Sequence, residues 1–496
     1  MIWRTMILLI TLIAGTLLGQ WGMPPENWGD FQIGLNSRPG APSATEMKSA
    51  LAAGKKLDRR YVYANSPEEI FPDGANAFLF TSWRNYATES GFYDKGVRPC
   101  FTVYMLQRGQ DGLEAVKNGA ADQSFMQEYF EALLVMLDSA KGTLPIYVIE
   151  PDVWGYCLQG FETTLGEANL NSTCHINDLG FNWLSEFENK IRDLPKAVIK
   201  TIKTRDPEAY AGILMAHWGY NPTGWGELVD FTPDQINTAA EKCAEFLGKL
   251  LGDTYKGDFI GVEKNGAAAG WYEVAQGTTK WYWNDAQHAN WLNWSTKMAK
   301  ALDLSLLGWQ ISAGYYNESG YPTLPNTANR YKDTFFPYFF KHVDDFIQAG
   351  FIGLMLGAGD RGVGTVCTKD NGTYDNGYFY DQMVAFDKGR PYDLTVATVM
   401  QDNDKTIPLY GMENIICKYN RITGTIVLNN SEAMFNKQLK VTLFTLCGKM
   451  AAVLYEGNAQ TQLALPVHSL QPAQGTYFVH VAQGTGEKMY PLVIVE

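Results

Sequence analysis

Residues 146–150 read IYVIE, and residues 259–263 read FIGVE. Each is a short apolar run that ends in a glutamate. Six further apolar runs recur along the chain, at residues 31–36 (FQIGLN), 60–64 (RYVYA), 101–106 (FTVYML), 213–217 (ILMAH), 306–310 (LLGWQ) and 351–357 (FIGLMLG). Strands as apolar as these are typical of a parallel sheet that is covered on both faces.

The segments between these runs carry the spacing of amphipathic helices. Apolar residues recur at intervals of three and four in residues 125–140, 238–251, 290–302 and 338–349. Strands that alternate with helices in this way predict a (β/α)8 barrel over residues 21–400. A doubly wound open sheet is the alternative. We expect no dinucleotide site in this chain.

The chain changes character near residue 400, where QDNDK at 401–405 reads as a polar linker. Beyond it, short strands between turn residues predict a small β-sandwich over residues 410–496. The strand order resembles the C-terminal sorting domain of type IX secretion cargo, in LFTLCGK at 443–449, in Leu465 and Leu470, and in GTYFVHV at 475–481. This resemblance implies that type IX secretion machinery is a partner. A carbohydrate-binding module is the alternative, and the lack of Trp in the tail disfavours it.

The N-terminus and the charge of the chain favour an exported, acidic protein. Arg4 and the apolar stretch at 6–18 predict a signal peptide over residues 1–20, with a membrane anchor as the alternative. No other stretch is long and apolar enough to span a bilayer, so we expect no stable membrane insertion after cleavage. A formal net charge of −13 disfavours nucleic acid as a partner. We therefore expect a secreted or cell-surface protein.

The cysteines and histidines give no sign of a metal site. None of the seven cysteines forms a C-x-x-C pair, and His217 and His288 lack metal-ligand spacing, so we expect neither metal nor cofactor. In an exported protein, Cys157 and Cys174 could form a disulfide across the loop after the fourth strand. Buried free thiols are the alternative.

The residues that end the eight runs are the candidates for function, because the active site of such a barrel lies at the C-terminal ends of its strands. Four carboxylates are candidate catalytic groups: Glu150, Asp152, Glu263 and Asp360. Six further side chains are candidates for substrate binding: Trp154, His217, Trp218, Trp271, Trp309 and Gln310.

This combination of residue types suits the cleavage of glycosidic bonds. That reaction needs one carboxyl group that holds a proton and a second that is ionised. Flat Trp faces stack on sugar rings. Glu150 and Asp152 form a like-charge pair, which raises one pKa and suits an acid catalyst. Structural alternatives are an ion pair for Glu150, Glu263 or Asp360, a helix cap for Asp152 and a core position for His217.

The string IEPD at residues 149–152 resembles the I-E-P-D at a strand end in glycoside hydrolase family 6, the inverting cellulases. In that family the Asp lines the catalytic centre, so the resemblance implies this role for Asp152. It covers one strand of the chain. The large clan of retaining barrel glycosidases instead places Asn-Glu at strand four and Glu at strand seven. Here Ile149 precedes Glu150 and the seventh run ends in Gln310, which departs from that arrangement.

These features predict a secreted glycoside hydrolase that cleaves a β-linked plant polysaccharide, as an endo-β-glucanase of the cellulase type. The alternative is a non-catalytic glycan-binding barrel at the cell surface. A peptidase or esterase is disfavoured, because neither G-x-S-x-G nor H-E-x-x-H occurs.

Overall fold

The chain divides into two compact units, Met1–Arg390 and Pro391–Glu496. The computed structural model describes residues 24–25, 28–36, 42–65, 67, 83–108, 110–159, 166–220, 231–264, 270–279, 282–312, 318–321, 332–357 and 377–389 of the first unit. In the second it describes residues 415–420, 425–430, 438–445, 450–458, 462–466, 475–483 and 486–494. Asp360 and the predicted signal peptide lie outside these residues.

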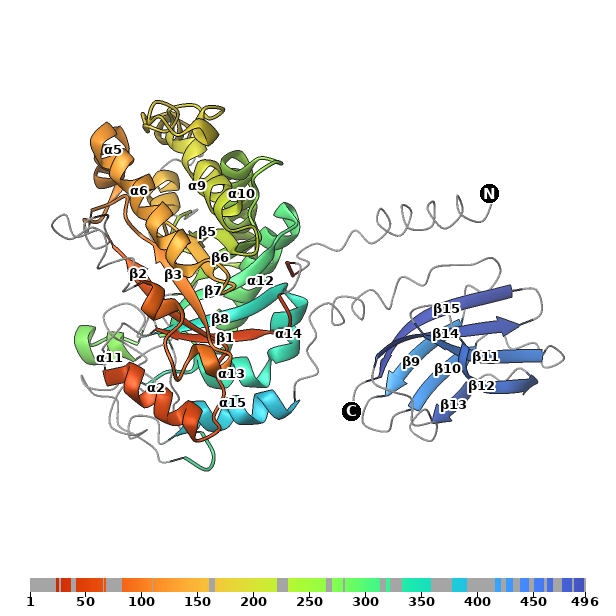
Figure 1. Cartoon of the computed structure of the whole chain (residues 1–496). Coiled ribbons are helices and arrows are strands. Elements are labelled where there is room, and N and C mark those ends of the chain that lie inside the picture. The colour runs from red at the N-terminus through yellow and green to blue at the C-terminus, as the bar shows by residue number, and fades with distance from the viewer. Residues whose placement is uncertain are drawn as a thin grey trace, which may run out of the picture. The chain divides into compact units, whose positions relative to one another are not determined.

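Eight parallel strands form a closed barrel in the first unit (Figure 1). They are β1 (Gln32–Asn36), β2 (Arg59–Ala64), β3 (Arg98–Val103), β4 (Ile146–Ile149), β5 (Tyr210–Ala216), β6 (Phe259–Glu263), β7 (Ser305–Ser312) and β8 (Phe351–Gly357). Each strand pairs with the next, and β8 pairs with β1. The predicted (β/α)8 fold is therefore confirmed.

Helices join the strands and form the outer layer of the barrel (Figure 1). They are α2 (Pro42–Ala52), η2 (Tyr93–Lys95), α5 (Leu113–Ala121), α6 (Gln123–Ala140), α7 (Val153–Leu158), α8 (Glu167–Leu170), η3 (Asn182–Leu184), η4 (Ile191–Asp193), α9 (Leu194–Arg205), α10 (Pro233–Leu251), α11 (Trp271–Gln276), α12 (Asp285–Leu302), α13 (Phe335–Lys341), α14 (Val343–Gln348) and α15 (Tyr378–Gly389).

Local sequence explains where several helices begin and end. Thr232 with Gln235 forms a capping box at the start of α10, and Asn284 with Gln287 forms one at the start of α12. The helix predicted over 338–349 is divided in two, because the backbone of His342 leaves helical geometry at φ −126° and ψ 25°. This correction places α13 and α14 where one helix was expected.

Large side chains fill the N-terminal end of the barrel. Arg59 is buried there, bonds Gln32 and the carbonyl of Leu144, and lies 5.7 Å from the ring of Trp28. The Trp28 indole donates to the carbonyl of Ile352 at 3.0 Å. Since this end is occupied, the C-terminal ends of the strands are the side that can receive a ligand.

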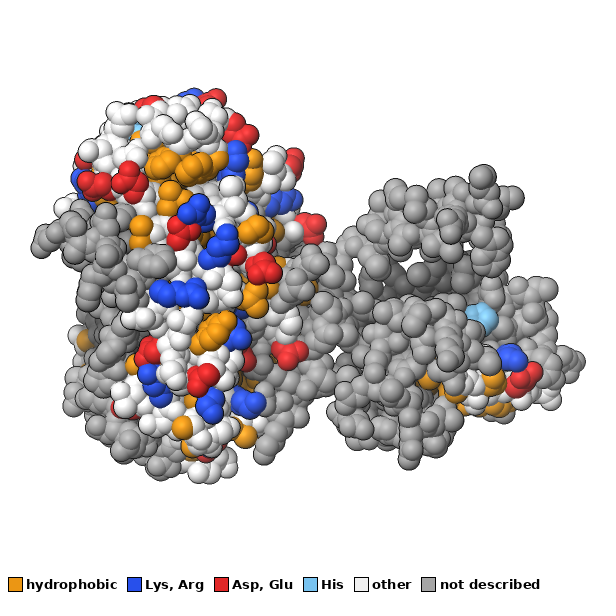
Figure 2. All heavy atoms as spheres, in the orientation of Figure 1, with side chains coloured by type: hydrophobic (Ala, Val, Ile, Leu, Met, Phe, Trp, Pro, Cys, Tyr) orange, Lys and Arg blue, Asp and Glu red, His pale blue; other side chains and the backbone are white. Residues whose placement is uncertain are grey.

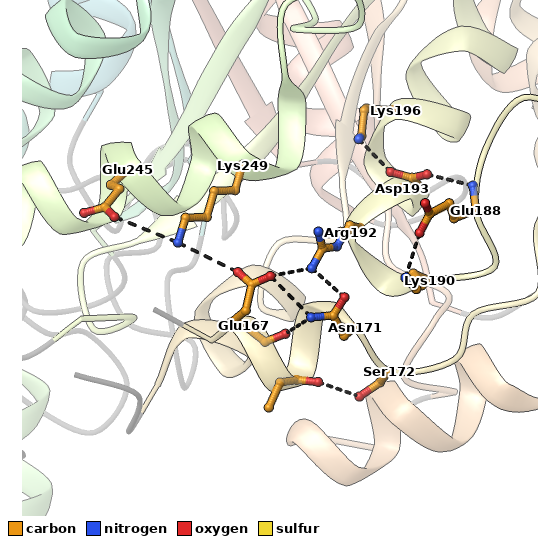
Figure 3. Close-up of polar contacts among 11 residues, drawn as sticks. Glu167, Asn171, Ser172, Glu188, Lys190, Arg192, Asp193, Lys196, Glu245 and Lys249 are labelled. Atoms are coloured by element: carbon orange, nitrogen blue, oxygen red, sulfur yellow. Dashed lines mark hydrogen bonds and ion pairs between the residues drawn. The ribbon is translucent and has the colours of Figure 1, made fainter. Parts of the chain in front are cut away.

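A long excursion between β4 and α9 is held by polar contacts (Figure 3). Arg192 donates to the side chains of Glu167 and Asn171, each at 2.5 Å. Cys157 and Cys174 are both buried and free, so the disulfide that the sequence allowed does not form. Burial raises the pKa of Cys157 to about 12, which disfavours the thiolate that oxidation requires.

The described strands of the second unit form two antiparallel sheets. One has the order β13-β10-β9 and the other the order β12-β11-β14-β15. Their strands are β9 (Ile415–Asn420), β10 (Thr425–Asn430), β11 (Gln438–Thr445), β12 (Met450–Asn458), β13 (Gln462–Pro466), β14 (Gly475–Gln483) and β15 (Gly486–Ile494). The sequence did not predict β12.

Among the described residues, no helix combines the length and the apolar character needed to cross a bilayer. Figure 2 shows one face of the first unit, on which Lys and Arg side chains are interspersed with Asp and Glu side chains. The described side chains on that face form no continuous basic strip of the kind that binds a nucleic-acid backbone.

Candidate active site

Aromatic side chains line the inside of the barrel near its C-terminal end. Tyr61 and Tyr63 of β2 lie 4.6 and 6.4 Å, between ring centroids, from Trp309 of β7. Because β2 and β7 are not neighbours, these contacts cross the barrel interior. Glu263, the last residue of β6, pairs in register with Trp309 and is 4% exposed. Glu263 therefore lies in the uppermost layer of the barrel.

An irregularity in β7 adds a polar group to this layer. Gln310 has φ +49°, and the pairing register shifts between Gly308 and Ile311. Left-handed backbone is unusual for a residue other than glycine and clusters at functional sites. The indole of Trp309 donates to the Tyr63 hydroxyl at 3.3 Å, and that hydroxyl donates to Gln310 Oε1 at 3.0 Å. Gln310 is partly exposed, whereas Trp309 is buried and forms part of the wall.

Asp152 reaches the same end of the barrel from the turn after β4. It precedes α7 but makes no capping hydrogen bond to that helix. Instead, the hydroxyl of Tyr104 donates to Asp152 Oδ2 at 2.7 Å. Tyr104 directly follows β3 and contacts Tyr63 edge-on at 6.1 Å. Asp152 therefore lies at the C-terminal end of the barrel and does not cap α7 through its side chain.

Asp152 and Glu263 both influence the pKa values of the same two phenol groups, those of Tyr63 and Tyr156. Burial raises the pKa of Tyr63 far above its usual range, and the charges of Glu263 and Asp152 raise it further. Burial, and then the charges of Asp152, Asp111 and Glu263, raise the pKa of Tyr156 on α7 to about 12. The side-chain contacts agree, because Trp309, the register partner of Glu263, donates to the Tyr63 hydroxyl, and Tyr63 packs against the Tyr104 that binds Asp152. The structure thus brings two of the predicted catalytic carboxylates together.

Glu150 lies behind this site. It is fully buried, has φ +48°, and its carboxyl accepts the backbone N–H groups of Met105 at 3.1 Å and Leu106 at 3.2 Å. Burial raises the pKa of Glu150 to about 8, and Asp152 contributes only a minor part of this shift. The carboxyl holds the turn after β3, under the Tyr104 that binds Asp152, so we assign Glu150 a structural part in the site.

Trp218 and Tyr156 form an aromatic surface beside the carboxylates. Their ring centroids are 5.1 Å apart, and both side chains are partly exposed. Gly155 packs under Trp218, where a Cβ atom would come within 2.6 Å of the indole. Trp154, predicted to bind substrate, is instead fully buried and donates to the carbonyl of Ile149 at 3.1 Å. Trp218 is therefore the better candidate for stacking on a ligand.

Two ring nitrogens fix the backbone of Glu263. Nδ1 of His217 lies 3.3 Å from the Glu263 carbonyl oxygen, and the indole of Trp291 donates to that oxygen at 3.1 Å. His217 is buried and its Nδ1 contacts the Glu263 backbone, so it contributes to positioning Glu263. Of the other predicted residues, Trp271 begins α11 and Asp360 is outside the described residues. Within the described part of the chain, no group of three acidic, His or Cys side chains could hold a metal ion.

Sequence reasoning missed the tyrosines of the site. Tyr63 is the next-to-last residue of the run RYVYA and shares one face of β2 with Tyr61, and Tyr104 directly follows β3. The signal for them is a tyrosine at or near the C-terminal end of a strand, where its hydroxyl can reach the mouth. Tyr156 and Asp111 follow strands at greater distance, and only the fold brings them to the mouth.

No family model and no curated protein sequence matches this chain. Solved structures with some similarity include an endo-β-1,4-mannanase from Cellulomonas fimi, at 10% identity, with 94% of each chain covered and a TM-score of 0.41. The endo-β-1,4-mannanase from Thermotoga petrophila is 11% identical, with 97% of this chain and 99% of that chain covered and a TM-score of 0.39. An endo-1,4-β-xylanase from Caldicellulosiruptor owensensis is 12% identical, with 66% and 85% covered and a TM-score of 0.35. Likeness at this level does not define a reaction.

Proposed function

We propose that this protein is a glycoside hydrolase whose catalytic carboxyl groups are Asp152 and Glu263. The observation that carries the proposal is their convergence from separate strands on one aromatic-lined barrel mouth. Trp309, the register partner of Glu263, donates to Tyr63, and Tyr63 packs against the Tyr104 that binds Asp152. In the reaction, one carboxyl gives its proton to the glycosidic oxygen as the C–O bond breaks. The other acts as a carboxylate, and water supplies the hydroxyl of the new reducing end and the proton that restores the acid.

We further propose a neutral, β-linked plant polysaccharide as the substrate, with a β-glucan as the first candidate. The resemblance of residues 149–152 to the cellulase sequence supports a β-glucan, and Asp152 of that string is at the mouth. Acidic side chains at the mouth disfavour a polyanionic chain. Secretion through type IX machinery, with a secreted or cell-surface location, follows from the resemblance of the tail and belongs to the same proposal.

Release of reducing ends from cellulose, mixed-linkage β-glucan, xylan and mannan tests the proposal. The purified full chain should release sugar from at least one of them, and a β-glucan should be the best. A protein that binds one of these glycans but releases nothing would contradict the proposal and support the alternative of a non-catalytic glycan-binding barrel.

Replacing Trp218 with Ala should weaken substrate binding with little effect on the chemical step. An aromatic face stacked on a sugar ring stabilises the complex by about 1 kcal/mol, so KM should rise roughly fivefold while kcat changes little. Steady-state kinetics on the best glycan measure both constants. Trp183→Ala is the matched control, because Trp183 is also partly exposed but bonds Thr201 of α9. An unchanged KM in Trp218→Ala would contradict the stacking role.

A further inference from the structure

Tyr104 binds Asp152 through a short hydrogen bond. Its hydroxyl donates to Asp152 Oδ2 at 2.7 Å, and Asp111 Oδ1 lies 3.3 Å from the same hydroxyl. A phenol carries one hydrogen, so it can serve only one of these two carboxylates at a time. The shorter distance assigns that hydrogen to Asp152, which is also less exposed than Asp111.

The fold fixes Tyr104 in this position. Its backbone N–H donates to the carbonyl of Ala64 at 2.9 Å, which continues the pairing of β3 with β2. The next two amides, of Met105 and Leu106, are held by the buried carboxyl of Glu150. The ring of Tyr104 packs edge-on against Tyr63 at 6.1 Å. The hydroxyl is thus a preorganised donor and not a mobile surface group.

We infer that Tyr104 is a positioning residue that holds Asp152 as the ionised carboxylate of the pair, and that Glu263 carries the proton. This inference rests on the proposed function. A hydrogen bond donated to a carboxylate favours its charged form, whereas Glu263 is almost wholly removed from solvent, which favours a neutral acid. Two carboxyl groups in such different surroundings can divide the tasks of base or nucleophile and acid.

Several titratable groups surround Asp152. Tyr104 and Asp111 face it from the segment after β3, Tyr156 from α7, Tyr63 from β2, and Glu150 precedes it in the same turn. Burial and the charge of Asp152 keep the pKa of Tyr104 far above its usual range, so the phenol stays protonated and can donate at any pH at which the enzyme works. The Tyr104 hydroxyl is therefore a permanent donor to Asp152, at 2.7 Å.

Tyr104→Phe tests the inference through the pH profile of kcat/KM. Loss of the donor should move the acidic limb to higher pH by about one unit and lower kcat roughly tenfold, with KM little changed. Tyr255→Phe is the control, because the Tyr255 hydroxyl also donates to a carboxylate, that of Glu186 at 2.6 Å, but on the exposed surface, and it should leave the limb in place. An unmoved limb in Tyr104→Phe, or an equal shift in Tyr255→Phe, would overturn the inference.

A stability measurement separates this inference from the proposed function, because it needs no substrate. The free energy of unfolding is measured from pH 4 to pH 7 for four proteins: the wild type, Tyr104→Phe, Asp152→Asn and the double variant. A carboxylate stabilised as an ion adds stability at pH 7 that is lost as the pH falls, so Tyr104→Phe should cost more at pH 7 than at pH 4. This pH dependence should vanish in the background of Asp152→Asn. If it persists there, Tyr104 acts on another group and the inference fails, whatever the protein hydrolyses.

Discussion

Glu263→Gln and Asp152→Asn should each lower kcat/KM by about 10³-fold or more on the best glycan, while the fold remains intact. An amide in place of the Glu263 carboxyl has no proton to give to the leaving oxygen, and an amide in place of the Asp152 carboxylate is neither a base nor a nucleophile. Both amides keep the shape of the side chain that they replace, so the packing around Glu263 and Asp152 should be preserved. The loss should therefore be in kcat.

Matched controls exist on the outer surface. Glu186 pairs with Lys200, and Asp138 pairs with Arg205, in exposed positions on the helical layer. Glu186→Gln and Asp138→Asn should retain full activity, since exposed ion pairs contribute little to stability. Circular dichroism confirms that each variant is folded. Activity of Glu263→Gln within about tenfold of the wild type would show that the catalytic carboxyl lies elsewhere.

Glu150 should make the stability of the barrel depend strongly on pH. Its pKa is raised to about 8 in the folded protein, chiefly by burial, and returns to an ordinary value when the chain unfolds. A group whose pKa is higher in the folded protein stabilises the fold fully at a pH below its pKa in the unfolded chain. This contribution is lost as the pH rises towards its pKa in the folded protein. Between about pH 4.5 and pH 8, the free energy of unfolding should therefore fall by roughly 1.4 kcal/mol per pH unit from this group.

Glu150→Gln should remove that slope. Denaturant unfolding from about pH 4.5 to pH 8.5, compared with the wild type, measures the difference. Glu128→Gln is the control, because Glu128 is an exposed glutamate on α6. Parallel curves for the wild type and Glu150→Gln would mean that Glu150 is ionised in the fold, and would contradict its place as a buried, protonated group.

The barrel could be predicted because its signal is local. Runs such as FIGVE and FIGLMLG are apolar throughout, and β6 and β8 have the predicted bounds. β12 was missed because residues 450–458 begin without clear alternation and start soon after β11, which ends at Thr445. The break at His342 depends on one backbone conformation, which no apolar pattern reveals.

Prediction of the site was only partial for a physical reason. The end of a strand indicates which residues reach the mouth, and this located Asp152 and Glu263. It does not indicate which way a side chain turns when the backbone becomes left-handed, as it does at Glu150 and Gln310. That turn directs Glu150 to the amides of the segment after β3 and brings Gln310 to Tyr63. The tyrosines of the site come from separate segments of the chain: Tyr63 from β2, Tyr104 from the segment after β3 and Tyr156 from α7.

The most direct test is hydrolysis of the best glycan in water enriched in oxygen-18, followed at once by mass spectrometry of the products. The account predicts that the wild type places one oxygen-18 atom at each new reducing end, and that Asp152→Asn and Glu263→Gln release no labelled product above background. Unlabelled products, or labelled products formed equally fast by Glu263→Gln, would contradict it.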